Sequence, residues 1–178
     1  MRKWNAILSA AIVALFLAHA ILGTLLLLGA GVVILKFLSH GLAGLIAVHT
    51  VIGVKLTVDA LRVRKRTGAG YFRENALFWA RRFSGLAVIV LIFFHVFAFT
   101  NVKDGVVHLL SFDTSRLITE LLFVLALAVH LIANIRPMLI SFGVTPLKAR
   151  VGEILLVLSL LLLVTAAAFI SYFLLWNS

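Results

Sequence analysis

Cysteine is absent from this sequence, and proline and acidic residues are scarce. The 178 residues include no cysteine, two prolines and six Asp or Glu, against 16 Lys or Arg. Without a thiol the chain cannot form a disulfide, ligate an iron–sulfur cluster or attach haem through thioethers. An iron–sulfur centre, if one is used, must therefore belong to a partner. The glycines form no nucleotide-binding loop.

Apolar residues make up most of what remains. The chain is 63% hydrophobic and only 12% charged, with a mean hydropathy of +1.20, whereas ordinary soluble domains are about 45–50% apolar. These values indicate an integral membrane protein. The formal net charge of +10 could point to nucleic acid, but the basic residues lie at the ends of apolar runs, where they set orientation in a membrane.

Five apolar runs are each long enough to cross a bilayer, which takes about 20 residues of helix. They cover residues 4–29, 33–61, 78–100, 117–142 and 151–176. The first run also resembles a signal peptide, because basic residues precede it and Ala18-His19-Ala20 mimics a cleavage site. Since the run continues beyond this triplet, we expect a membrane span. The predicted fold is one all-α domain, a five-helix membrane bundle.

Basic residues predict which side of the membrane each connection faces. The segment Arg62 to Arg73 carries five cations and cannot lie in lipid, so the positive-inside rule places it in the cytoplasm. The side of the membrane that contains this segment collects 12 of the 16 basic residues: Arg2, Lys3, Arg62, Arg64, Lys65, Arg66, Arg73, Arg81, Arg82, Arg136, Lys148 and Arg150. We therefore expect a cytoplasmic N-terminus and, after five spans, an outer C-terminus.

Two local features modify the simple pattern of spans. The outer segment Asn101 to Arg116 contains Val106 to Leu110, for which we expect a short helix at the interface, and His108, for which we expect an exposed position. Pro137 lies near the inner end of the fourth span. Because proline lacks a backbone donor, it should kink that end.

Four histidines lie deep inside four successive spans: His19, His49, His95 and His130. Ionisable groups in hydrocarbon are costly and usually functional. His19 and His95 each lie 15 residues from the inner end of their span, or ~22 Å, whereas His49 and His130 lie 12 and 11 residues away, or roughly 17–18 Å. Helices one and three, and two and four, are diagonal in an up-and-down bundle. Depth therefore predicts the pairs His19–His95 and His49–His130.

Paired neutral imidazoles across a bundle are typical of bis-histidine ligation of b-type haem. The first four spans would then form a four-helix haem-binding core. Small or short residues one turn after three of the ligands would leave room for the porphyrin: Gly23, Gly53 and Asn134. Cations toward the inner ends of three spans would bind the propionates: Lys55, Arg82 and Arg136. The alternatives are core histidines that hydrogen-bond between helices, and a haem-free transporter that uses them for protons or cations.

The chain resembles the cytochrome b anchors of succinate dehydrogenases and fumarate reductases. The run Tyr71 to His95, with Trp79 and Arg82-x-Ser84-Gly85, is similar to their third helix. His130 followed by Ser141-Phe142-Gly143-Val144-Thr145-Pro146 is similar to their fourth helix and its exit, and five spans are typical of the single-chain dihaem type. The first two spans are joined by a shorter connection than is usual in that family.

The resemblance implies a distal haem on His19 and His95 and a proximal haem on His49 and His130. It also implies a cytoplasmic iron–sulfur subunit, an FAD flavoprotein subunit and a quinone, menaquinone in the dihaem type. A related alternative is the cytochrome b anchor of a hydrogenase or another quinone-linked dehydrogenase. If the chain belongs to a succinate dehydrogenase or fumarate reductase, the dicarboxylate site would lie in another subunit.

Three polar residues are candidates for the quinone site, because quinone reduction takes up protons. Glu120 and His40 lie toward the outer ends of apolar spans, and Ser84 belongs to the inner Arg-x-Ser-Gly step. Two haems make most sense if electrons cross the membrane, which favours the outer site. The alternative for Glu120 is a carboxylate that extends to the interface beside Arg116.

Overall fold

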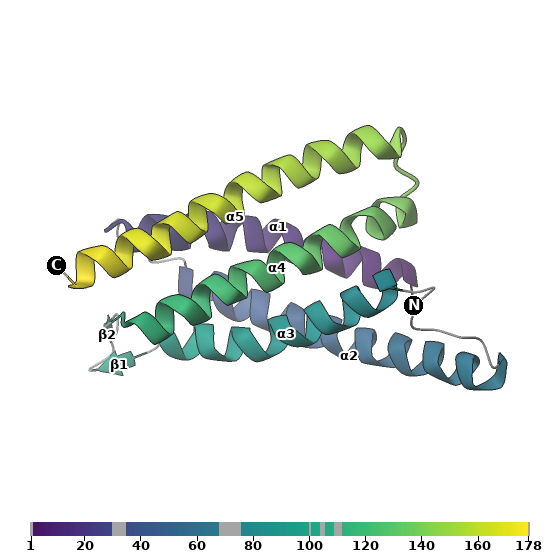
Figure 1. Cartoon of the computed structure of the whole chain (residues 1–178), viewed down its shortest axis with the longest axis horizontal. Coiled ribbons are helices and arrows are strands. Elements are labelled where there is room, and N and C mark those ends of the chain that lie inside the picture. The colour runs from purple at the N-terminus through teal and green to yellow at the C-terminus, as the bar shows by residue number, and fades with distance from the viewer. Residues whose placement is uncertain are drawn as a thin grey trace.

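Five long helices dominate the fold (Figure 1). The computed structural model describes residues 2–29, 35–67, 76–99, 101–103, 106–108 and 112–177. The helices are α1 (Arg2–Leu27), α2 (Leu35–Thr67), α3 (Ala76–Phe99), α4 (Thr114–Ser141) and α5 (Leu147–Asn177). Each contains a stretch long and apolar enough to cross a membrane, as the sequence predicted. The chain therefore has the character of a multi-pass membrane protein.

The helices extend beyond the predicted spans where polar residues support them. α2 continues to Thr67 through a run of basic residues, because cations are favourable near a helix C-terminus. α4 begins at Thr114 because the Asp113 side chain accepts a hydrogen bond of 2.8 Å from the backbone N–H of Arg116. Hydropathy marks only the apolar part of a helix. The predicted spans therefore ended α2 too early, at residue 61, and began α4 too late, at residue 117.

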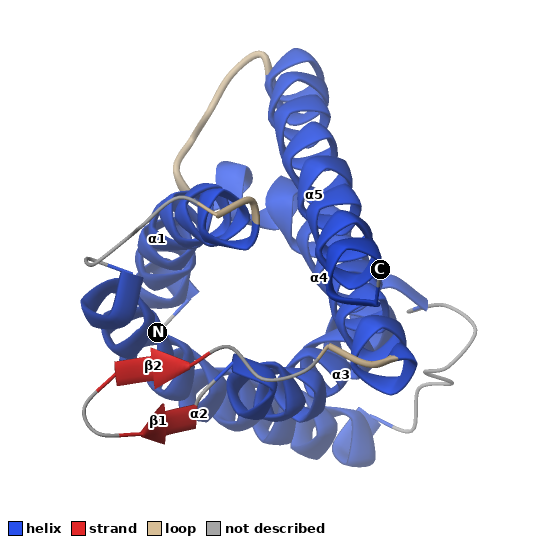
Figure 2. Cartoon of the chain, turned by 90° about the vertical axis from the view of Figure 1, so that its left-hand side faces the viewer, coloured by secondary structure: helices blue, strands red, loops and turns tan. Residues whose placement is uncertain are grey.

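The helices surround a common axis when the bundle is viewed from one end (Figure 2). α1 packs on α2, α3 packs on α4, and α5 packs against both α4 and α1. The N- and C-terminal ends lie at opposite ends of the bundle, as an odd number of passes requires (Figure 1). This arrangement leaves α1 facing α3, and α2 facing α4, across the middle.

A short β-hairpin follows α3, so the predicted interfacial helix at Val106–Leu110 is wrong. β1 (Asn101–Lys103) pairs antiparallel with β2 (Val106–His108), and Val102 lies opposite Val107. β-Branched residues favour extended backbone, and the sequence places Asp104-Gly105, a common hairpin turn, between the two valine-containing segments. Leu109 and Leu110 lie outside the described residues. The prediction of an all-α five-helix fold is confirmed, and this two-stranded hairpin is the one departure from it among the described residues.

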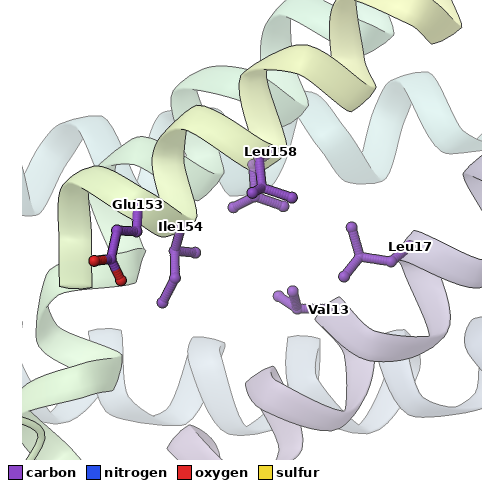
Figure 3. Close-up of a pocket in the computed structure, with 6 residues that line it drawn as sticks. Val13, Leu17, Glu153, Ile154 and Leu158 are labelled. Atoms are coloured by element: carbon purple, nitrogen blue, oxygen red, sulfur yellow. The ribbon is translucent and has the colours of Figure 1, made fainter.

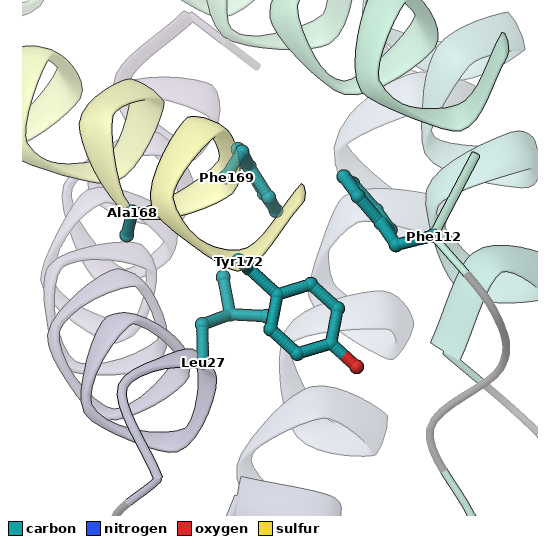
Figure 4. Close-up of a cluster of buried hydrophobic side chains, with 5 residues drawn as sticks. All are labelled: Leu27, Phe112, Ala168, Phe169 and Tyr172. Carbon is teal, nitrogen blue, oxygen red and sulfur yellow. The ribbon is translucent and has the colours of Figure 1, made fainter. Parts of the chain in front are cut away.

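Buried apolar side chains gather mainly where α5 meets its neighbours. One cluster, near the hairpin, consists of Leu27, Phe112, Ala168, Phe169 and Tyr172 (Figure 4). Another, toward the opposite end, consists of Ile135, Leu139 and Leu158. Asn177, at the end of α5, contacts the cluster near the hairpin: its side-chain amide donates to the carbonyl of Phe112 at 3.1 Å. The apolar core therefore lies on the α5 side, and the four deep histidines lie on α1 to α4.

Candidate functional site

The four deep histidines form two pairs across the bundle. The ring centroids of His19 on α1 and His95 on α3 are 6.1 Å apart, and those of His49 on α2 and His130 on α4 are 6.4 Å apart. These are the pairs that helix depth predicted. His19 and His95 lie near the hairpin end of their helices and are called the hairpin-side pair. His49 and His130 lie nearer the basic end of α2 and are called the basic-side pair.

Both separations suit two imidazoles on a single metal ion. A metal–imidazole bond is about 2.0–2.1 Å long, so two rings facing each other across one ion have centroids roughly 6.3 Å apart. The observed 6.1 and 6.4 Å lie on either side of that value. Direct hydrogen bonding between the two rings would bring them closer. Each pair therefore has room for an ion with two axial nitrogen ligands.

His19 is oriented by Ser39 on α2. The Ser39 hydroxyl donates to the backbone carbonyl of Leu35 at 2.7 Å, and its oxygen lies 3.3 Å from Nδ1 of His19. Because the hydroxyl proton is already used, the oxygen accepts and Nδ1 of His19 donates. This tautomer leaves the lone pair on Nε2, the nitrogen that would ligate a metal.

His130 has the same kind of support from the Ser84-Gly85 step on α3. The Ser84 hydroxyl donates to the carbonyl of Arg81 at 3.4 Å, and its oxygen lies 3.2 Å from Nδ1 of His130. A Cβ atom on Gly85 would lie 3.2 Å from Cε1 of the same ring. The serine hydroxyl therefore contacts Nδ1 of His130, and the glycine makes room for the imidazole. Ser84, predicted as a quinone candidate, is placed beside a ligand candidate.

His95 is held by a buried carboxylate. Its Nδ1 lies 2.8 Å from Oε2 of Glu120, whose side chain is only 1% exposed. The ring of Phe123, one turn further along α4, lies 5.1 Å from the His95 ring. Glu120 does not extend to the interface beside Arg116, so that alternative is wrong. The position of Glu120 along its helix did not predict this contact, because the direction of its side chain, between α3 and α4, depends on how the two helices pack.

His49 differs from the other three. Its Nδ1 is buried and has no hydrogen-bond partner among the described residues. The four imidazoles thus have unequal surroundings at Nδ1: two face serine hydroxyls, one faces a carboxylate, and one has no hydrogen-bond partner in the described part of the chain. Sequence reasoning did not anticipate this difference.

Arg81 joins α3 to α4 close to His130. Pro137 has no backbone N–H, so the carbonyl of Ala133, four residues earlier, loses its helical donor. Nε of Arg81 donates to that carbonyl at 2.9 Å. A half-buried cation at the α3–α4 contact thereby satisfies the acceptor that proline exposes, and α4 continues as helix through Pro137 to Ser141.

We expect Arg81→Met to destabilise the protein, because the Ala133 carbonyl would be left buried without a donor, at a cost of about 1–3 kcal/mol. Thermal unfolding in detergent measures the loss. The control is the same change in a Pro137→Ala background, where residue 137 regains an N–H and can bond Ala133 directly. The loss should largely disappear there. Equal destabilisation in both backgrounds would contradict this role of Arg81.

The predicted propionate cations differ in their positions. Arg82 lies near enough to His49 and His130 for its charge to act on both rings, and it also lies over the Phe78 ring at 4.9 Å. Lys55 and Arg136 are exposed, and so is His40. Of these residues, the structure brings only Arg82 to a histidine pair.

The three residues expected to leave room for a porphyrin behave in two ways. Gly23 and Gly53 face open space, with nothing within 4 Å of a Cβ built on either one. Asn134 turns its amide back to the carbonyl of His130 at 2.7 Å, so it does not extend across the bundle. The two glycines therefore leave the helix surface one turn after His19 and His49 free of close neighbours.

The donor set suits a macrocyclic metal group better than a bare ion. No group of three or more His, Asp or Glu residues able to hold a metal occurs among the described residues. A protein site for zinc supplies three or four ligands, whereas two axial imidazoles suffice when a macrocycle supplies the equatorial nitrogens. The residues present therefore fit haem.

A separate cavity of about 250 Å³ lies between α1 and α5 (Figure 3). Its lining is apolar except for Glu153: Val13, Leu17, Glu153, Ile154, Val157 and Leu158. On α1, His19 is about 200° around the helix from Leu17 at ~100° per residue. The cavity thus lies on the outer side of α1, away from the histidine pairs.

Comparisons with known proteins give no match to a family model, a curated protein or a solved structure. The resemblance to dihaem anchors therefore remains a hypothesis, for which the geometry of the four histidines is the main support.

Proposed function

We propose that this chain is a membrane cytochrome b that binds two b haems and carries electrons between cytoplasmic redox subunits and a quinone. The observation that supports it is the pair of imidazole separations, 6.1 and 6.4 Å, each of which suits a single ion between two rings. Three of the four rings also have a polar side chain at Nδ1, the nitrogen that would not bind metal.

Each pair has a defined part in this proposal. His49 and His130 would hold the inner haem, and His19 and His95 the outer one. Ser39 and Glu120 would accept from Nδ1 of His19 and His95 and so leave Nε2 available to bind metal. Ser84 would orient His130 through Nδ1, and Arg82 would supply positive charge for the propionates of the inner group. Haem iron, when bound, supplies reversible one-electron transfer, which is the step needed between a flavin or iron–sulfur donor and a quinone.

The basic end of α2 is the proposed face for the cytoplasmic partners. Arg62, Lys65 and Arg66 are exposed there, beyond the apolar part of the helix. A positive surface of this kind favours and steers association with an acidic one. We propose that it receives an iron–sulfur subunit, which in turn carries an FAD flavoprotein, as in succinate dehydrogenase or fumarate reductase.

We place quinone chemistry near the hairpin side. A quinone that takes up protons needs a polar group within reach of a haem, and Glu120 is beside His95 with its second oxygen, Oε1, buried and without a hydrogen-bond partner among the described residues. The Ser84 hydroxyl is already placed on His130, which makes the inner site less favourable. Menaquinone is the quinone that the family resemblance implies.

The proposal is tested by purifying the protein in mild detergent and measuring haem per polypeptide and the reduced-minus-oxidised spectrum. We expect two haems per chain, a b-type spectrum, and full extraction of haem by acid and organic solvent, since there is no cysteine to hold it covalently. A chain that stays haem-free, both as purified and after addition of hemin, would exclude a cytochrome. Such a result would favour a transporter that uses the histidines for protons or cations.

The nature of the partners separates the two cytochrome alternatives. Co-purification with a chain that contains covalent or tightly bound flavin, together with activity on succinate or fumarate, supports the proposed complex. Co-purification with a hydrogenase or formate dehydrogenase subunit would support the related alternative.

A further inference from the structure

The hydrogen bonds to the histidine rings differ most strongly at His95. Its Nδ1 faces a carboxylate oxygen at 2.8 Å, whereas His19 and His130 face neutral hydroxyls at 3.3 and 3.2 Å. His49 has no partner at Nδ1 among the described residues. Hydrogen bonds to an ionised acceptor are shorter and roughly twice as strong as those between neutral groups.

This difference bears directly on the two metal sites. A carboxylate that accepts the Nδ1 proton increases the electron density at Nε2 and makes the imidazole a stronger donor. A more basic ligand, with a negative charge close behind it, stabilises ferric over ferrous iron. The hairpin-side pair would feel this effect and the basic-side pair would not, because among the described residues no carboxylate contacts Nδ1 of His49 or His130.

The position of Glu120 is well fixed. Its side chain is 1% exposed, so water screens the charge poorly. Phe123 packs against the same His95 ring with centroids 5.1 Å apart, so α4 holds this ring by two residues on adjacent turns.

We propose that Glu120 is a positioning residue that lowers the reduction potential of the outer haem by accepting the Nδ1 proton of His95. This inference rests on the proposed function, because it requires that His95 ligate iron. Glu120 acts through His95 and not by contact with the iron.

The experiment compares wild type with Glu120→Gln by potentiometric titration of both haems at one fixed pH. Glutamine keeps the shape and can still accept the Nδ1 hydrogen bond through its amide oxygen, but it lacks the charge. We expect the ferric form of the outer haem to become less favoured by about tenfold relative to the ferrous form, a rise of about 59 mV for a one-electron couple. The inner potential should stay unchanged, and the haem content should remain two.

Three controls make the result specific. Glu153→Gln removes an exposed carboxylate on α5 that pairs with Arg150, so neither potential should move. His95→Ala leaves only the inner haem and thereby assigns the two titration waves. Electron paramagnetic resonance g values of the outer haem report the ligand field independently of potential, and they should shift in Glu120→Gln only.

The outcomes distinguish this inference from the proposed function. A wild-type chain without haem refutes the function, whereas two haems with both potentials unchanged in Glu120→Gln refute only the role of Glu120. Should the glutamine variant lose the outer haem, Glu120→Asp takes its place, because it shortens the side chain by one methylene and so withdraws the carboxylate from its 2.8 Å contact with Nδ1 of His95. A raised outer potential in that variant supports the proposal, and the wild-type potential overturns it.

Discussion

Loss of one haem is the expected result of replacing any one of the four paired histidines by alanine. His49→Ala or His130→Ala should remove the inner haem, and His19→Ala or His95→Ala the outer one, because each iron would lose an axial bond. Haem per polypeptide should fall from two toward one in every variant. The spectrum of the remaining haem should be the same for the two members of a pair and different between pairs.

The control for this series is His40→Ala. His40 lies on α2, as His49 does, but it is exposed and nine residues earlier in the chain. Its replacement should leave both haems in place. Four variants that all retain two haems would refute the ligand assignment. If two variants from different pairs gave the same residual spectrum, the pairing would be refuted instead.

Gly85→Leu is expected to have an effect almost as large, although Gly85 cannot bind metal. A Cβ at this position would already lie 3.2 Å from Cε1 and 3.5 Å from Nδ1 of His130, and the rest of a leucine side chain would extend further into the space of the ring. Overpacking of this kind usually costs about 1–3 kcal/mol, and turning the imidazole aside is the easiest relief. We expect the inner haem to be lost and the outer haem to be retained.

The matched control for Gly85→Leu is Gly152→Leu on α5. Nothing lies within 4 Å of a Cβ on Gly152, and the residue is exposed. This variant should therefore keep two haems and its thermal stability. Retention of a fully occupied inner site in Gly85→Leu, with unchanged spectrum and potential, would show that the close contact between Gly85 and His130 is unimportant for ligation.

Both predictions concern residues whose role depends on α3 packing against α4. Gly85 and Ser84 contact His130, Glu120 contacts His95, and Arg81 contacts the Ala133 carbonyl, all across that same helix contact. α4 therefore supplies His130 to the basic-side pair and Glu120 to the hairpin-side pair. A change that shifts α4 along α3 should disturb both metal sites together.

Depth along a helix could be determined from the sequence alone. Membrane thickness fixes the length of an apolar run, and the helical rise fixes how far each histidine lies from the end of its run. These two quantities sufficed to predict five helices and to pair His19 with His95 and His49 with His130, as the ring distances of 6.1 and 6.4 Å bear out. The ligand role itself remains a prediction.

Rotation about a helix axis was decided only by the tertiary structure. Hydropathy says little about it in a membrane, because both the lipid-facing and the bundle-facing sides are apolar. Ser84 and Glu120 are recognisable in the sequence as rare polar residues within apolar spans. The sequence does not show that they face His130 and His95. Ser39 and Arg81 had no recognisable signal, since their partners, the Nδ1 atom of His19 and the Ala133 carbonyl, lie 20 and 52 residues away in the chain. Contacts of this kind exist only after α1, α2, α3 and α4 have taken up one particular set of rotations, which interhelical packing selects.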